Sequence, residues 1–185
     1  GTTVSRTRAG AVAGLDRSRV TAIFARNTWV CAITDVDGLL CWGSGSTMDG
    51  RLPIRVAGPS MAGREMSAGS EHACVILTDG SIRCWGDNSS GQLGTGLGAY
   101  APSPAPVQGL DSTITSASGG AHSCAVTADG GVLCWGSNAY GELGDGTHTT
   151  RRTPVAVIGL SDRITAVAAG EYHTCALTAK GKVWC

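Results

Sequence analysis

The sequence is poor in several residue types, and each shortage excludes something. Phe occurs once and Tyr three times among 185 residues, so most aromatic packing must come from five Trp. Basic and acidic residues are equal at 14 each, which removes the excess positive charge expected of a nucleic-acid-binding protein. No apolar run reaches the ~20 residues that a membrane-spanning helix needs. We therefore expect no nucleic-acid partner and no membrane span.

Glycine and cysteine, by contrast, are abundant. The 28 Gly separate many short apolar runs, a pattern typical of all-β proteins. The eight cysteines form four pairs whose members are ten positions apart. The pairs are Cys31 and Cys41, Cys74 and Cys84, Cys124 and Cys134, and Cys175 and Cys185. Such regular, even spacing predicts a disulfide framework, and therefore a secreted protein in the extracellular space or at the cell surface.

Each cysteine pair brackets a turn. Between Cys74 and Cys84, residues 78–80 (Thr-Asp-Gly) suit a three-residue hairpin loop with the glycine in the left-handed position. That register sets the two cysteines directly opposite each other, where Cα atoms ~4.5–5.5 Å apart permit a disulfide. The third and fourth pairs give the same count, whereas Gly38 lies one place later and predicts a different turn in the first pair.

A metal site is the alternative use of these residues. His72 and Cys74 share one face of a strand and Cys84 lies opposite, which gives three potential zinc ligands. The set recurs in two later copies, but Trp29 replaces the histidine in the first copy and no fourth ligand recurs. We therefore expect no metal and interpret the recurring histidine as a hydrogen-bonded structural residue between strands.

An internal repeat organises the chain. Residues 72–96 read HACVILTDGSIRCWGDNSSGQLGTG and residues 122–146 read HSCAVTADGGVLCWGSNAYGELGDG. A shorter copy starts at His173, and a degenerate one covers residues 29–43. Each copy predicts an apolar strand, two strands that carry the cysteines, and a fourth strand led by proline. Because proline has no N–H to donate, the fourth strand should lie at a sheet edge.

Four-stranded sheets repeated in this way fit the blades of a β-propeller. We expect one repeat domain over residues 1–185, in which the last copy stops after its third strand. The expected units are a lone fourth-type strand within residues 1–15, three repeats at 16–60, 61–110 and 111–160, and a truncated repeat at 161–185. The stretch Ala9–Leu15 resembles the fourth strand without its proline.

The spare strand leaves three outcomes open. Ala9–Leu15 could complete the last sheet within one molecule and close a ring of about four blades. It could instead complete the sheet of another copy by strand addition, which makes a ring or a filament. The chain, which begins at Gly1 rather than Met, could also be a piece of a longer propeller.

The run C-W-G-x-N-x-x-G-x-L-G-x-G in the second and third copies resembles the repeats of the regulator of chromosome condensation family. The resemblance is partial in the first copy and truncated in the fourth. It implies a β-propeller that acts mainly as a protein-binding scaffold. The paired cysteines resemble the secreted bacterial members of that superfamily.

No catalytic motif is apparent. GQLGTG and GELGDG lead to no expected helix, which a dinucleotide-binding fingerprint requires, so their glycines serve turns. We therefore expect no enzyme activity and no cofactor. Four tryptophans, at positions 42, 85, 135 and 184, follow the repeat and are expected to pack between blades. Tyr100 and Tyr140 lie in loops and Tyr172 just precedes a strand, so these three residues are the predicted partner surface.

These features favour a non-catalytic extracellular β-propeller that binds a protein partner or further copies of itself. One alternative is a propeller that binds glycans or other ligands, as lectins and inhibitors do. Another is a guanine nucleotide exchange factor, which the regular disulfides disfavour because that activity is intracellular. Asn88 begins a glycosylation sequon that has meaning only in a eukaryotic secretory pathway.

Overall fold

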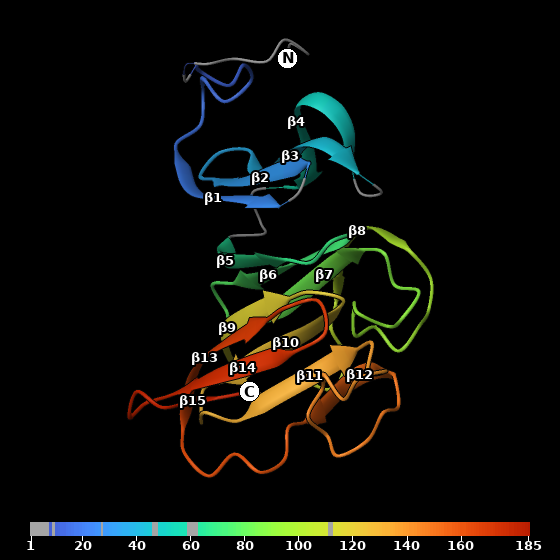
Figure 1. The fold of residues 1–185 in the computed structure, drawn as a ribbon. Coiled ribbons are helices and arrows are strands. Elements are labelled where there is room, and N and C mark those ends of the chain that lie inside the picture. The colour runs from blue at the N-terminus through green and yellow to red at the C-terminus, as the bar shows by residue number, and fades with distance from the viewer. Residues whose placement is uncertain (1–7, 9, 27, 46–47, 59–62, 111–112) are drawn as a thin grey trace.

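The computed structural model describes residues 8, 10–26, 28–45, 48–58, 63–110 and 113–185, which form an all-β protein. Its strands build four antiparallel sheets, in each of which the strand order follows the chain (Figure 1). The first three sheets have four strands each and the last has three. Among the described residues there is no helix of the length and hydrophobicity that a membrane crossing needs.

The strands recur in the order that the repeat predicts. The first sheet contains β1 (Val20–Arg26), β2 (Trp29–Thr34), β3 (Gly38–Gly45) and β4 (Met48–Ala57). The second sheet contains β5 (Gly63–Ala68), β6 (His72–Leu77), β7 (Ile82–Gly86) and β8 (Ala101–Pro106), and the third contains β9 (Ile114–Gly119), β10 (His122–Thr127), β11 (Val132–Gly136) and β12 (Arg151–Ala156). The last sheet contains β13 (Ile164–Ala169), β14 (Thr174–Thr178) and β15 (Val183–Trp184). Strands β4, β8 and β12 all lie at sheet edges, as predicted. The prolines expected to lead them, Pro53, Pro104 and Pro154, lie inside the strands instead.

The cysteine hairpins have the expected register. Cys74 pairs with Cys84 across β6 and β7, and their Cα atoms are 4.0 Å apart. The Leu77 N–H donates to the carbonyl of Ser81 (2.8 Å), and Gly80 takes a φ of 83°. All four pairs are joined as disulfides: Cys31–Cys41, Cys74–Cys84, Cys124–Cys134 and Cys175–Cys185. The thiolates that the zinc alternative needs are therefore not present.

The sheets stack in sequence like blades, with their first strands side by side (Figure 1). Glycines make this close approach possible. A Cβ at Gly69 would overlap the His72 ring and the carbonyl of Gly120, and a Cβ at Gly120 would overlap the carbonyl of Gly170. Three hydrophobic clusters fill the spaces between successive sheets, and each cluster contains residues from both neighbours.

The start of the chain differs from the prediction. Ala9 lies outside the described residues, and residues 10–15 form turns and irregular backbone rather than a strand. Ser18 bonds to Asp37, which holds this segment beside the first sheet, at the opposite end of the stack from β15 (Figure 1). Within the part of the chain that the structure describes, the last sheet therefore has three strands and the four sheets do not close into a ring. The segment has little apolar surface to bury, and Gly14, with a φ of 93°, interrupts extended backbone.

Candidate functional site

Two of the three predicted surface tyrosines meet in the structure. Tyr140 lies in the loop after β11 and Tyr172 in the turn before β14, so they come from the third and last sheets. Their ring centroids are 5.1 Å apart with an edge-to-face angle of 70°. Both rings are more than half exposed. Tyr100 is also exposed but belongs to the second sheet and has no part in this pair.

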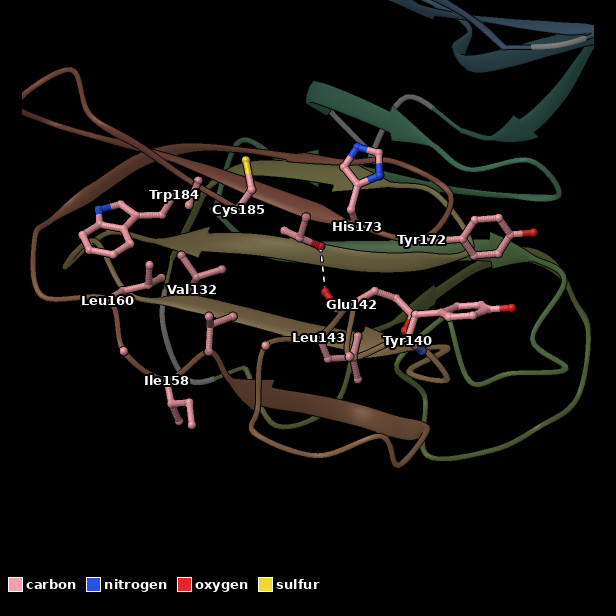
Figure 2. Close-up of a pocket in the computed structure, with 16 residues that line it drawn as sticks. Val132, Tyr140, Glu142, Leu143, Ile158, Leu160, Tyr172, His173, Trp184 and Cys185 are labelled. Carbon is pink, nitrogen blue, oxygen red and sulfur yellow. Dashed lines mark hydrogen bonds between the residues drawn. The ribbon is translucent and has the colours of Figure 1, made fainter.

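A cavity of about 500 Å³ adjoins the tyrosine pair (Figure 2). It lies between the third and last sheets, with Tyr140 and Tyr172 at one end. Its apolar walls come from Val132, Leu143 and Val157 of the third sheet and its loops, and from Ala176 and Trp184 of the last sheet. This size falls within the range of small-ligand sites, ~300–1,000 Å³.

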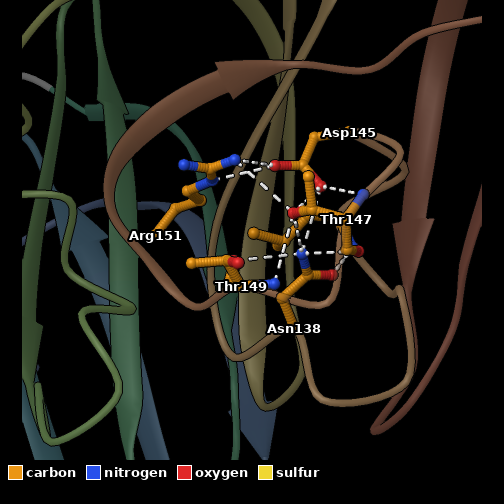
Figure 3. A network of polar contacts seen from close by, with 6 residues as sticks. Asn138, Asp145, Thr147, Thr149 and Arg151 are labelled. Carbon is orange, nitrogen blue, oxygen red and sulfur yellow. Dashed lines mark hydrogen bonds and ion pairs between the residues drawn. The ribbon is translucent and has the colours of Figure 1, made fainter.

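A buried asparagine shapes the loop that carries Tyr140. Asn138 has no exposed surface; its Oδ1 accepts from the Leu143 N–H (3.0 Å) and its Nδ2 donates to the carbonyls of Thr147 and Thr149 (3.1 Å each; Figure 3). The side chain thus provides hydrogen bonds to loop backbone groups that do not pair with a neighbouring strand. Asn88 occupies the same place in the second sheet: it is fully buried, and it bonds Leu93 N–H and Leu97 O.

An ion pair closes the same loop. Burial of Asp145 would raise its pKa, but hydrogen bonds from Thr147, Arg151 and Asn138 outweigh it and hold the pKa at about 2. The Arg151 Nε donates to Asp145 Oδ2 at 2.8 Å. Glu142 is also buried, and its carboxylate accepts from the Ser137 hydroxyl (3.0 Å) and the Tyr140 N–H (2.7 Å). These contacts fix the backbone at the mouth of the cavity.

Two of the three recurring histidines connect neighbouring sheets. His72 Nε2 lies 2.8 Å from the hydroxyl of Ser123 in the next sheet, and that hydroxyl donates to the Gln92 carbonyl (2.8 Å). His122 repeats the arrangement one sheet later, with Nε2 2.5 Å from the Thr174 hydroxyl, which donates to the Glu142 carbonyl (2.8 Å). The prediction of a hydrogen-bonded structural histidine is confirmed for His72 and His122, whose bonds cross between sheets rather than between strands of one sheet. The third copy, His173, is exposed and lines the cavity instead.

The electrostatic state of His122 follows from this geometry. Because the Thr174 hydroxyl donates to Glu142, it must accept from His122, which places the proton on Nε2. Burial lowers the pKa of His122 from its ordinary 6.5 to about 4, and the nearby Glu142 charge offsets only part of the effect. Its Nδ1 is buried without a hydrogen-bond partner among the described residues. His122 is therefore neutral at physiological pH.

Two family models match the repeats of this chain. A model described as the regulator of chromosome condensation (RCC1) repeat matches residues 79–126 and 129–177, and a second model of that description matches residues 64–92. Together the matches cover more than half of the chain. The chain belongs to the regulator of chromosome condensation repeat family.

Several solved structures are similar to this chain over nearly all of its length. Human WBSCR16 has a TM-score of 0.81 at 22% identity, over 92% of this chain and 48% of that one. Prp20p of Saccharomyces cerevisiae has a TM-score of 0.78 at 20% identity, over 93% and 46%. The receptor kinase CR4 ectodomain of Physcomitrella patens has a TM-score of 0.62 at 21% identity, over 96% and 43%. The chain spans about half the length of these three structures.

The sequence did not reveal the cavity or the role of Trp184. Trp42, Trp85 and Trp135 each follow the second cysteine of their repeat, whereas Trp184 precedes Cys185. Trp184 pairs with Ala176 instead, lines the cavity, and is 45% exposed, while Trp85 and Trp135 are fully buried between sheets. The expectation of packing between blades is therefore confirmed for Trp85 and Trp135 and wrong for Trp184. Trp42 is half-buried and belongs to none of the hydrophobic clusters between sheets. Its position relative to the cysteine was the signal that distinguishes it.

Proposed function

We propose that this RCC1-repeat chain is a non-catalytic extracellular module that binds another protein through the tyrosine pair and the adjoining cavity. The contact between Tyr140 and Tyr172 carries the proposal, because it presents two exposed rings from different sheets beside a concave site. Aromatic anchors held in place are enriched at protein interfaces, where they offer a large contact area at a small entropic cost.

Known structures with this fold support protein as the class of ligand. One contains Kap60 bound to yeast RCC1 (Prp20), and another concerns the binding of Prp20p to Gsp1p and histones. The loops that hold Tyr140 also favour recognition over chemistry. Glu142, the carboxylate beside the cavity, is occupied by bonds from Ser137 and from the backbone of Tyr140.

The disulfides support an extracellular location. Regular structural disulfides persist in oxidising compartments and are rare in the cytosol. Each of the four joins two strands of one hairpin, so the framework is a repeated structural feature. The similar CR4 structure is the ectodomain of a receptor kinase, which supports an extracellular location.

The test is site-specific photo-crosslinking on the chain secreted by its native cells. A photoreactive phenylalanine analogue at position 140 or 172 should form a covalent adduct with one protein, and the same analogue at Tyr100 should not. In a chain that carries the photoreactive analogue at a position other than 140 or 172, the double substitution Tyr140→Ala and Tyr172→Ala should abolish binding of that protein. Equal crosslinking at all three positions, or none at any of them, would contradict the proposal.

Self-association is a second candidate function, favoured by the exposed end of the stack. In the first three sheets, the aliphatic pair that flanks each hairpin turn is at most 4% exposed and packs on the next sheet. These pairs are Ile33 and Leu39, Ile76 and Ile82, and Val126 and Val132. The corresponding pair in the last sheet, Leu177 and Val183, is 40% and 64% exposed.

The first sheet carries the complementary surface. Met66 and Val167, which pack against the preceding sheet, are 5% and 8% exposed, whereas Ile23 at the same place in β1 is 63% exposed. The edge of β15 also offers backbone groups to a further strand, in the manner of strand addition. We therefore propose that copies of the chain join head to tail, last sheet to first sheet.

A further inference from the structure

The disulfides act within single sheets, and the contacts between sheets are of another kind. Each of the four disulfides joins two strands of one hairpin. Between sheets, Trp135 Nε1 donates to the Gln92 carbonyl (2.9 Å), and the Thr174 hydroxyl donates to the Glu142 carbonyl (2.8 Å). Hydrogen bonds and apolar packing thus join one sheet to the next. A covalent bond between sheets would add a constraint that the disulfides do not supply.

The tyrosine pair lies across one of these sheet boundaries. Tyr140 belongs to the loop after β11 and Tyr172 to the turn before β14, and their ring centroids are 5.1 Å apart. Figure 2 shows the two rings close together, with both hydroxyl groups directed away from the cavity. A bond between the rings would therefore join the third sheet to the last.

Hydrogen bonds hold the backbone on both sides of this contact. The Tyr140 N–H donates to the Glu142 carboxylate (2.7 Å), and the Gly170 N–H donates to the His173 carbonyl (2.8 Å) in the turn that carries Tyr172. The rings meet edge to face at an angle of 70°, and the carbons beside the hydroxyl-bearing carbon lie on the ring edge. Rotation of the side chains is enough to bring these carbons of the two rings together.

A carboxylate next to the pair can take the proton that a tyrosine loses on oxidation. The Tyr172 hydroxyl donates to Glu171 Oε1 at 2.8 Å. This hydrogen bond and the negative charge of Glu171 raise the pKa of Tyr172, so the phenol keeps its proton at neutral pH. Loss of an electron makes a phenol strongly acidic, and a base within hydrogen-bond reach then accepts the proton. Glu171 therefore favours the conversion of Tyr172 into a neutral radical.

We propose that Tyr140 and Tyr172 form an oxidation site, at which a haem peroxidase acting with hydrogen peroxide joins the two rings as dityrosine. Each ring loses one electron and its phenolic proton, and the proton of Tyr172 passes to Glu171. The radicals couple through a carbon–carbon bond between carbons next to the hydroxyl-bearing carbons. The hydrogens of those carbons move to the oxygens and restore both phenols. The two electrons and two protons released reduce hydrogen peroxide to two molecules of water.

The dityrosine link goes beyond the proposed function, because its formation requires no protein partner. It would restrict the unfolded chain as a disulfide does, but between two sheets rather than within one hairpin. Tyr100, in the second sheet, has no part in the ring contact and serves as the internal control.

The first test treats the disulfide-bonded 185-residue chain, at low concentration, with a haem peroxidase and hydrogen peroxide. The monomer should develop dityrosine fluorescence and lose the mass of two hydrogen atoms. Peptide mass spectrometry should place the link between residues 140 and 172, and with three tyrosines in the chain the assignment is unique. Dityrosine confined to covalent dimers, or a link that includes Tyr100, would overturn the proposal.

Conservative variants assign the roles of the residues. Tyr140→Phe and Tyr172→Phe should each abolish the link within the monomer, whereas Tyr100→Phe should leave its yield unchanged. Glu171→Gln cannot take the proton, so it should slow formation of the link about ten-fold, the equivalent of one hydrogen bond to a charged group. Glu71→Gln, in the turn before β6, is the control for that change. Formation of the link at the wild-type rate in Glu171→Gln would refute the role of this carboxylate.

Urea unfolding measures the effect of the link on the sheets. The linked chain should unfold at a higher urea concentration than the untreated chain, because the bond restricts the unfolded state. Tyr140→Phe exposed to the same oxidant is the control and should show no such increase. Equal midpoints for the linked and untreated chains would contradict a bond that joins the two sheets. A chain that forms the link but captures no protein in photo-crosslinking would overturn the proposed function and leave this inference standing.

Discussion

At the scale of single residues, His122 shows how burial and hydrogen bonding select one chemical state. The ring is fully buried, and the Thr174 hydroxyl requires a proton on Nε2. A second proton on Nδ1 would add a charge in a buried place with no partner among the described residues. The histidine therefore links the third and last sheets only in its neutral form.

This state predicts a pH-dependent stability. The folded pKa of His122, about 4, lies below the ordinary 6.5, so the unfolded chain binds more protons between these values. Neutral His122 contributes about 3 kcal/mol to the free energy of unfolding above pH ~6.5, and this contribution is lost as the pH falls toward 4. Urea unfolding from pH 7 to pH 4 measures it.

His122→Gln should remove that part of the pH dependence. The matched control is His148→Gln, because His148 lies in an exposed loop outside the sheet contacts. Its unfolding profile should follow that of the wild type. If the free energy of unfolding of His122→Gln depends on pH as that of the wild type does, another group takes up the proton.

Local contacts were predictable from the sequence, whereas contacts between sheets were not. The opposition of Cys74 and Cys84 and the left-handed Gly80 were predictable, because both depend on neighbours a few positions away. The partner of His122, in contrast, comes from the next sheet, 52 residues along the chain. Contacts of that kind depend on how sheets stack, which no local pattern specifies.

At the scale of strands and sheets, the close approach of first strands controls how tightly the blades can pack. Gly120→Ala should place a methyl group against the backbone carbonyl of Gly170, which cannot move aside as a flexible side chain would. We expect it to lower the free energy of unfolding by about 2 kcal/mol or more. Gly58→Ala, with no atom within 4 Å of the added methyl, is the control and should be near neutral in urea unfolding.

The disulfides act at the same scale, within single hairpins. The pair of substitutions Cys124→Ser and Cys134→Ser should lower the free energy of unfolding by about 2–3 kcal/mol. The unfolded chain loses the constraint of the disulfide, and the folded chain buries two serine hydroxyls in place of the disulfide. The pair Cys175→Ser and Cys185→Ser lies in the more exposed last sheet and should cost less. Guanidinium unfolding compares them; equal losses would mean that burial of the hairpin has no influence.

The first copy shows the consequence of a shorter loop. It lacks the G-x-L-G segment that supplies the Gln92 and Glu142 carbonyls in later copies. Trp85 Nε1, which would use such a carbonyl, is buried without a partner among the described residues. The sequence predicted the difference in loop length, but its effect on a tryptophan in the next sheet required the structure.

At the scale of the whole molecule, the open stack makes the prediction of self-association testable. Light scattering on the wild-type chain should show concentration-dependent assembly. Leu177→Asp and Ile23→Asp should each abolish it, because each puts a charge into the apolar contact. A mixture of the two variants should form only dimers, since one contact remains intact. Leu97→Asp, an exposed loop position, is the control, and a wild-type chain that stays monomeric would refute the prediction.

The order of the sheets was predictable from the repeat, but the shape of the stack was not. Sixteen expected strands suggested four complete blades, whereas the described residues form fifteen strands because residues 10–15 do not join a sheet. A short segment rich in glycine and alanine resembles a strand in sequence while lacking the apolar area that holds one in place. Whether such a segment pairs as a strand depends on a sheet edge that is distant in the sequence.

Hydrogen exchange on the chain with and without its crosslinked partner tests the central claim most directly. Protein recognition at the cavity between the third and last sheets predicts slower exchange at residues 140–144 and 172–176 in the complex. It predicts no change in the loop around Tyr100. Protection confined to the second sheet, or to the outer strand β12, with the cavity residues unchanged, would contradict the account.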